Sequence, residues 1–212
     1  ASRGMKALQV NLHAVFSGSP GTGKTTFARY YAQEIRKLGL LEKGQLIEVS
    51  RPDLVAEFMG QTATKTTKVV NAAKGGVLFI DEAYALKQAK DDAFGQECID
   101  TLIKHIEDLR GELILILAGY TDEMREFLHL NPGFKSRIPN HIEFQDFTDD
   151  ELGKIFDRMC VKAGMVMSLE NRAFALEEVI RKRKGRSFGN AREVRNIFER
   201  ASDAIFIASA TG

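Results

Sequence analysis

The chain has 212 residues, of which 44% are apolar and 28% are charged, and its formal net charge is +1. This is an ordinary globular composition, which excludes a disordered or fibrous chain, and a net charge near zero gives no sign of a polyanion partner. Cys98 and Cys160 have neither metal-ligand nor redox spacing, and no apolar run reaches the ~20 residues of a membrane-spanning helix. We therefore expect a soluble, cytoplasmic protein with no membrane partner.

Short apolar runs alternate with helical patterns up to about residue 146. The strand candidates are residues 12–17, 46–50, 77–81, 113–118 and 141–144. Between them, apolar residues recur at helical spacing in residues 25–38 and again in residues 98–109. Gly39 and Gly111 follow these two patterns and are expected to end the helices. Strands that alternate with helices predict a parallel α/β sheet flanked by helices.

The rest of the chain has a different pattern. Beyond residue 146 no strand pattern recurs. Thr148 and Glu151 have the spacing of a capping box, and so do Asn190 and Glu193. We predict a nucleotide-binding core over residues 1–146 and a small α-helical domain over residues 147–212.

A glycine-rich loop lies between the first predicted strand and the first predicted helix. It reads Gly18-Ser19-Pro20-Gly21-Thr22-Gly23-Lys24-Thr25 and matches the phosphate-binding P-loop, or Walker A motif. Its glycines let successive main-chain N–H groups turn towards phosphates at a helix N-terminus. Lys24 is expected to reach the β- and γ-phosphates, and the Thr25 hydroxyl to bind Mg²⁺. The predicted cofactors are therefore ATP and Mg²⁺, and the predicted nucleotide contacts are Ser19, Pro20, Gly21, Thr22, Gly23, Lys24, Thr25 and Thr26.

Two consecutive carboxylates follow the apolar run at residues 77–80. Asp81 and Glu82 would stand at the carboxyl end of that strand, where ligands bind in open α/β sheets. Asp81 is expected to hold Mg²⁺, and Glu82 to act as the general base that polarises the attacking water. An acidic pair alone is more often a solvated turn, but the P-loop upstream favours the functional interpretation.

These motifs together resemble those of the AAA+ ATPases. The matching segments are Gly18 to Thr25 and residues 53–62, 76–86, 116–120, 130–137 and 188–192. Within the family the chain is most similar to the group that contains the CbbX-type rubisco activases and stage V sporulation protein K. The resemblance covers residues 12 to 200 and implies a sheet of order 5-1-4-3-2 with an α-helical lid. It also implies a homo-oligomeric ring, usually of six subunits, with ATP bound between subunits.

The resemblance assigns roles to two arginines. Arg137 matches the arginine finger, which acts on the γ-phosphate of a neighbouring subunit and is worth roughly 10³ to 10⁵ in rate. The alternative is a solvated loop arginine. Arg192 matches the sensor-2 arginine of the Gly-x-Ala-Arg pattern, which touches the bound phosphates. The predicted catalytic set is therefore Lys24, Glu82, Arg137 and Arg192.

A third matched segment concerns the client. Phe58-Met59-Gly60 matches the pore loop that grips a polypeptide in the centre of the ring, and the alternative is a core phenylalanine at a helix end. The sequence thus predicts an ATPase that remodels or threads a client protein. A nucleotide-gated assembly scaffold with little threading activity is the rival interpretation. A DNA-directed motor is disfavoured because residues 57–64 contain no Lys or Arg.

Two features depart from the family pattern. Tyr120 stands where AAA+ proteins often place the sensor-1 Asn, so the sequence leaves that role open. Residues 1–11 stand where relatives carry a helical segment before the first strand.

Two further signals are weak. The basic run at residues 181–186 is explained as the end of a helix and not as a nucleic-acid patch. The histidines, at positions 13, 105, 129 and 141, show no metal-ligand spacing.

Overall fold

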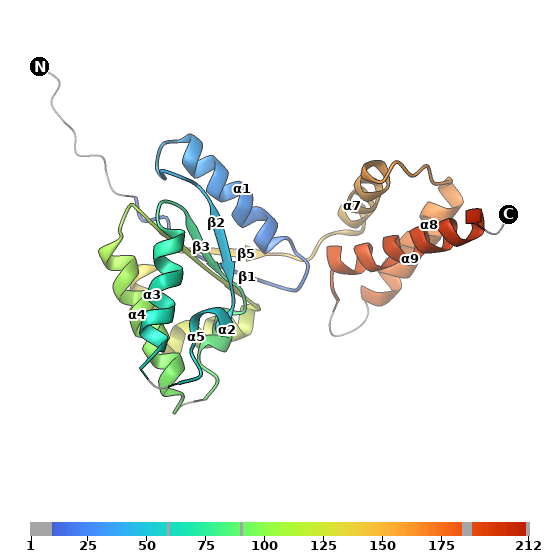
Figure 1. Cartoon of the computed structure of the whole chain (residues 1–212). Helices are drawn as coiled ribbons and strands as arrows, with labels where there is room; N and C mark the ends of the chain where they lie inside the picture. Colours follow the sequence, from blue (N-terminus) through green and yellow to red (C-terminus); the bar gives the residue numbers. More distant parts are fainter. Residues whose placement is uncertain (1–9, 59, 90, 184–187, 211–212) are drawn as a thin grey trace, which may run out of the picture. The chain divides into compact units, whose positions relative to one another are not determined.

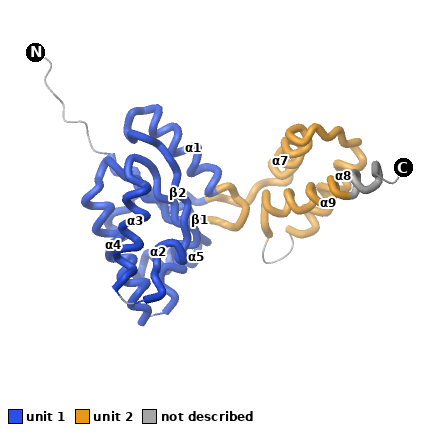
Figure 2. The backbone as a smooth tube through the Cα atoms, viewed as in Figure 1, with its two compact units in different colours: residues 1–17, 24–143 blue, residues 18–23, 144–212 orange. Residues whose placement is uncertain are grey.

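The structure is a computed structural model that describes residues 10–58, 60–89, 91–183 and 188–210. Contacts divide the chain into two compact units (Figure 2). The first unit consists of Ala1–Ser17 and Lys24–Glu143, and the second of Gly18–Gly23 and Phe144–Gly212. The glycine-rich loop thus belongs, by its contacts, with the C-terminal helices, although the chain continues from it directly into the first unit.

The first unit is built around a five-stranded sheet, whose last strand ends where the second unit begins (Figure 1). Its strands are β1 (Ala14–Gly18), β2 (Leu46–Val49), β3 (Val77–Ile80), β4 (Ile114–Gly119) and β5 (Asn140–Phe144). Their order is β2-β3-β4-β1-β5, and the pairs β1–β4, β2–β3 and β3–β4 are parallel. This is the predicted order 5-1-4-3-2, read from the other edge, so the predicted fold class is confirmed.

The central strands are apolar on both faces because helices cover both faces of the sheet. Every residue of β3 and of β4 is buried. The helices of this unit are α1 (Lys24–Lys37), α2 (Arg51–Leu54), α3 (Thr62–Ala73), α4 (Ala93–Asp108), α5 (Thr121–Leu130) and α6 (Pro132–Arg137), with a 3₁₀ turn η1 (Ala83–Leu86). On one face Phe16 of β1 meets Phe27 and Tyr31 of α1 edge to face. On the other, Leu78 and Cys98 belong to the same apolar cluster.

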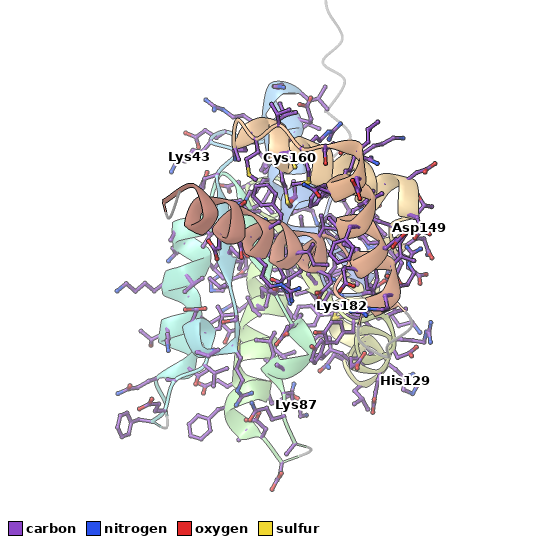
Figure 3. All side chains as sticks on the ribbon, turned by 90° about the vertical axis from the view of Figure 1, so that its right-hand side faces the viewer. Lys43, Lys87, His129, Asp149, Cys160 and Lys182 are labelled. Carbon is purple, nitrogen blue, oxygen red and sulfur yellow. The ribbon has the colours of Figure 1, made fainter. Side chains whose placement is uncertain are left out.

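The helices of the second unit are α7 (Asp149–Lys162), α8 (Leu169–Arg183) and α9 (Ala191–Ala210). They share an apolar core to which Phe156, Cys160 and Val194 contribute. Cys160 is labelled among the side chains in Figure 3. Thr148 and Glu151 form the predicted capping box at the start of α7. None of the helices in the described ranges is both long and apolar enough to span a bilayer.

The second predicted capping box, at the start of α9, is wrong. The side chain of Asn190 accepts its hydrogen bond from the Phe147 main-chain N–H, not from that of Glu193. The Glu193 carboxylate instead pairs with Lys182 of α8. The side chains of Asn190 and Glu193 therefore bond to residues from other segments, whereas the capping-box spacing predicts that each bonds to the main chain of the other.

Candidate functional site

The P-loop leaves the sheet at the carboxyl end of β1 and leads into α1. Lys24, Thr25 and Thr26 are the first three residues of that helix. They therefore stand in the first turn of α1, whose N-terminal N–H groups attract anions. Strand, loop and helix follow one another as the motif requires.

The backbone of the loop depends on glycine. Gly18, Gly21 and Gly23 have φ values of 146°, 71° and 91°, a range that residues with a side chain rarely adopt. Gly21 also has no room for a side chain, because a Cβ there would lie 2.0 Å from the carbonyl oxygen of Gly189. The Thr22 hydroxyl donates to the Ser19 carbonyl oxygen at 2.8 Å and closes the turn.

Asp81 and Glu82 directly follow β3 at the edge where the P-loop leaves β1. The pairing of β3 with β4, and of β4 with β1, places the carboxyl ends of these strands side by side. The Asp81 carboxylate is oriented by a hydrogen bond from the Glu82 main-chain N–H to its Oδ1, 3.0 Å long. Glu82 itself has φ 48° and ψ 46°, the left-handed conformation. Such a backbone costs about 1–3 kcal/mol for a residue other than glycine and is concentrated at functional sites.

Two tyrosines cover the end of β4 next to this acidic pair. Tyr120 follows the strand, and its ring stacks on Tyr84 of η1 with centroids 5.8 Å apart. A Cβ at Gly119 would lie 2.8 Å from the Tyr84 ring, so glycine there lets the ring lie against the strand end. Burial, followed by the charge of Glu82, raises the pKa of Tyr84 to about 12. Tyr84 has no role in the motifs read from the sequence, and the signal that could have found it is its place two residues after the acidic pair.

Arg137, the predicted arginine finger, is the last residue of α6. Its Nε donates to Glu107 Oε2 at 3.0 Å, and its Nη1 donates to the Gly133 carbonyl oxygen at 3.3 Å. The side chain is 36% exposed. In the single chain this guanidinium therefore lies at the surface, paired with a carboxylate of α4.

Arg192, the predicted sensor-2 residue, is the second residue of α9, and it is exposed. Its main-chain nitrogen would lie 3.0 Å from a Cβ added at Gly21. The second unit thus brings the start of α9 against loop 18–23. Lys24, Asp81 and Glu82 belong to the first unit.

The predicted pore loop lies between α2 and α3. Phe58 is 67% exposed, which contradicts the alternative of a core phenylalanine. Gly60 has φ 76° with open space around it, and Met59 lies outside the described residues. An exposed aromatic ring in this loop is free to contact another molecule.

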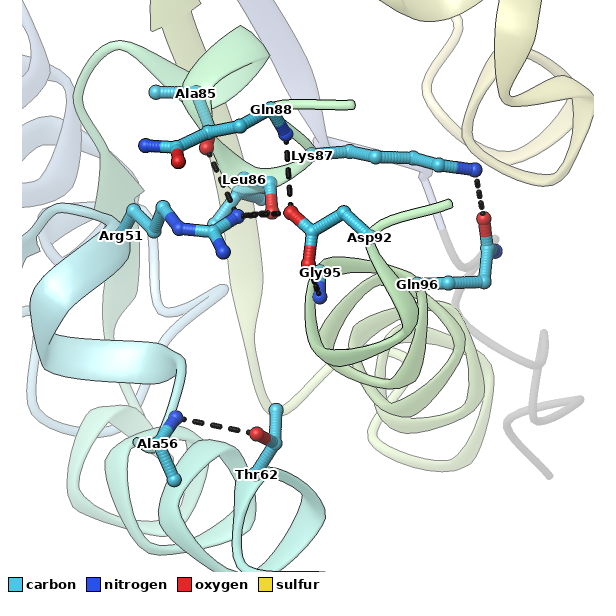
Figure 4. A network of polar contacts seen from close by, with 10 residues as sticks. All are labelled: Arg51, Ala56, Thr62, Ala85, Leu86, Lys87, Gln88, Asp92, Gly95 and Gln96. Atoms are coloured by element: carbon cyan, nitrogen blue, oxygen red, sulfur yellow. Dashed lines mark hydrogen bonds and ion pairs between the residues drawn. The ribbon is translucent and has the colours of Figure 1, made fainter. Parts of the chain in front are cut away.

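A polar network supports the segment that follows Glu82 (Figure 4). Arg51 of α2 donates to the carbonyl oxygen of Leu86 in η1 and to the Asp92 carboxylate, the latter at 2.7 Å. Asp92 also accepts from the main-chain N–H groups of Gln88 and Gly95. Burial by itself would raise the pKa of Asp92, but these hydrogen bonds outweigh it and lower the pKa to about 2. The network therefore fixes η1, and with it Tyr84, to α2 and α4.

Comparison with known proteins agrees with this geometry. Residues 14–146 match the model of the ATPase family associated with various cellular activities (AAA), and residues 148–205 match the AAA lid domain. Stage V sporulation protein K of Bacillus subtilis is 44% identical over 205 residues, which cover 95% of this chain and 63% of that protein. The chloroplastic ribulose bisphosphate carboxylase/oxygenase activase of Cyanidioschyzon merolae is 43% identical over 199 residues, which cover 93% of this chain and 68% of that protein.

The fold comparison points the same way. A Thermotoga maritima RuvB mutant superposes with a TM-score of 0.66 at 23% identity, covering 93% of this chain and 57% of that chain. This likeness concerns the fold alone. The chain spans about two thirds of the length of the curated relatives it matches. The predicted resemblance is confirmed: the chain belongs to the AAA ATPase family.

Proposed function

We propose that this chain binds ATP with Mg²⁺ and hydrolyses it, through a nucleotide-binding α/β core over residues 1–146 and an α-helical lid over residues 147–212. One observation carries the proposal. The P-loop leaves β1 at the same sheet edge at which the acidic pair Asp81-Glu82 follows β3. Ligands of open α/β sheets bind beyond the carboxyl ends of the strands. Membership of an ATPase family supports the same activity.

Nucleotide binding would use the loop and the first turn of α1. Lys24 would hold the β- and γ-phosphates, and main-chain N–H groups of the loop would face the phosphate oxygens. The Thr25 hydroxyl and the Asp81 carboxylate would hold Mg²⁺, which prefers such oxygen ligands. The orientation of Asp81 by the Glu82 N–H fits this role. The bound ion would neutralise phosphate charge.

Hydrolysis would need one group that activates the attacking water and others that stabilise the negative charge of the transition state. Glu82 would accept a proton from the attacking water. Arg192 would stabilise charge on the phosphates, and an Arg137 contributed by a neighbouring subunit would do so from outside. To act in this way, Arg137 must leave Glu107. That exposed ion pair holds it by no more than about 1 kcal/mol.

The client would be another protein, gripped by Phe58 in the centre of a homo-oligomeric ring, most simply a hexamer. An exposed aromatic ring binds polypeptide with little dependence on sequence. One relative is named as the activase of another enzyme, which favours a protein client over a nucleic acid. The rival function is a nucleotide-gated scaffold, favoured only if Phe58 proves dispensable.

Two measurements test the proposal. The ATPase rate per subunit should rise with protein concentration, because Arg137 acts across subunits, and Glu82→Gln should abolish the rate at every concentration. An unfolded protein such as casein should stimulate the rate, and Phe58→Ala should remove this stimulation. Phe174→Ala, at a lid position that is 66% exposed, is the matched control and should retain it. Stimulation that survives in Phe58→Ala would favour the scaffold.

A further inference from the structure

Asn190 is a fully buried polar residue in a strained conformation. Its exposed fraction is 0%, and its φ is 45°, so it adopts the left-handed region without being a glycine. Such strain costs on the order of 1–3 kcal/mol and persists only where the surroundings fix it. A buried amide side chain must also find hydrogen-bond partners for its oxygen and its nitrogen. The hydrogen-bond partners of Asn190 therefore show which contacts depend on its strained conformation.

The Asn190 amide joins three segments of the second unit that are far apart in sequence. Its Oδ1 accepts from the Phe147 main-chain N–H at 2.9 Å. Its Nδ2 donates to the Asp146 carboxylate at 2.9 Å and to the carbonyl oxygen of Pro20 at 3.3 Å. One side chain thus links the P-loop, the segment before α7 and the first turn of α9.

The main chain next to Asn190 makes a second link to the same loop. The Ala191 N–H donates to the carbonyl oxygen of Gly21 at 3.2 Å. In a phosphate-binding loop the N–H groups face the anion, so the carbonyl groups face away and need other donors. For Pro20 and Gly21 these donors come from the start of α9. The helix that carries Arg192 is therefore attached to the outer side of the loop.

We propose that Asn190 is a positioning residue that couples phosphate binding in loop 18–23 to the placement of α9 and Arg192. This inference rests on the proposed nucleotide binding. A phosphate that orders the loop N–H groups also orders the opposite carbonyl groups, and through Asn190 and Ala191 it fixes the first turn of α9. The coupling is reciprocal: the factor by which bound nucleotide favours this placement of α9 is also the factor by which the placed α9 raises the affinity for nucleotide.

Two variants separate this coupling from simple support of the fold. Asn190→Gly keeps the positive φ but removes all three side-chain contacts. The double variant Asp146→Asn with Asn190→Asp keeps an acceptor for the Phe147 N–H and restores a hydrogen bond between positions 146 and 190. It supplies no donor to the Pro20 carbonyl oxygen. The double variant therefore keeps both contacts with the segment before α7, and it replaces the donor to the loop by a carboxyl oxygen that faces the Pro20 carbonyl oxygen.

The test measures Mg·ATPγS affinity and amide hydrogen exchange of residues 191–197, with and without nucleotide. In the native chain, nucleotide should slow exchange at these residues. In both variants the dissociation constant should rise roughly 5- to 50-fold, and exchange should no longer respond to nucleotide. Melting temperatures measured in parallel show how much stability each variant loses.

Four outcomes count against the proposal. A native exchange response in Asn190→Gly would overturn it, and so would full recovery of affinity in the double variant. If the native chain shows no Mg²⁺-dependent nucleotide binding, the proposed function fails and this inference fails with it. Normal binding with an unchanged exchange response in the variants would overturn this inference alone.

Discussion

The rings of Tyr84 and Tyr120 stack 5.8 Å apart over the end of β4, in the place where AAA+ proteins often carry a sensor-1 Asn. Tyr120 begins α5, and Tyr84 belongs to η1, which follows Glu82. The stack therefore connects the end of β4 with the segment that carries the acidic pair. We expect a coupling of about 0.5–1.5 kcal/mol between the two rings. A double-mutant cycle of Tyr84→Leu and Tyr120→Leu in urea unfolding measures it, and additive effects would show that the stack contributes nothing.

Glu82 should limit stability as well as support hydrolysis. Glycine adopts φ 48° without strain, so Glu82→Gly should stabilise the fold by about 1 kcal/mol while removing the proposed base. The rate should fall roughly 10²- to 10⁴-fold. Glu82→Gln, which keeps the strained backbone, should lose the rate and leave the melting temperature unchanged. A less stable Glu82→Gly would contradict the assignment of strain to this residue.

Arg137 and Arg110 form a matched pair, because both guanidinium groups contact Glu107. We expect Arg137→Ala to lower the ATPase rate of the assembled protein by roughly 10³-fold or more, as for other arginine fingers, with nucleotide affinity largely kept. Arg110→Ala breaks a similar exposed ion pair and should leave the rate near native. Steady-state kinetics at saturating ATP compare the two. Equal ATPase rates in the two variants would show that Arg137 is a surface arginine with no part in hydrolysis.

The Arg51–Asp92 ion pair should give the fold an acid-sensitive contribution. The pKa of Asp92 is about 2 in the folded chain and has an ordinary value of 3.8, so its stabilising effect is full above pH 3.8 and is lost as the pH falls towards 2. Asp92→Asn should therefore destabilise the chain by roughly 2 kcal/mol at pH 5 and by much less at pH 2.5. Urea unfolding across this range measures the difference.

Asp122→Asn is the control for this pH dependence. Asp122 also pairs with an arginine, Arg125, but its side chain is 88% exposed. Exposed ion pairs contribute little to stability, so this variant should match the native chain at both pH values. An Asp92→Asn effect that does not change with pH would contradict a depressed pKa.

Local patterns predicted the sheet and the P-loop because each depends on neighbouring residues. Strand order came from the family resemblance, and the acidic pair from its place after an apolar run. Thr62 and Thr66 near the start of α3 are both fully buried, although threonine is mostly an exposed residue type. Their hydroxyl groups bond to the Ala56 N–H and to the Leu54 carbonyl oxygen, across a turn that composition does not reveal.

Contacts between residues that are far apart in the sequence could not be predicted, because no local pattern indicates them. Asn190 and Pro20 are 170 positions apart, and Arg137 and Glu107 are 30 positions apart. Asn190 has the spacing of a helix cap, and nothing local shows that its amide bonds elsewhere. Only the folded chain brings these partners together.

Calorimetric titration of the chain with ATPγS, with and without Mg²⁺, measures nucleotide binding at the P-loop without any need for assembly or a client. The account predicts Mg²⁺-dependent binding to the native chain. It predicts that Lys24→Ala loses this binding. The account would be contradicted if the native chain took up no nucleotide, or if Lys24→Ala bound nucleotide as tightly as the native chain.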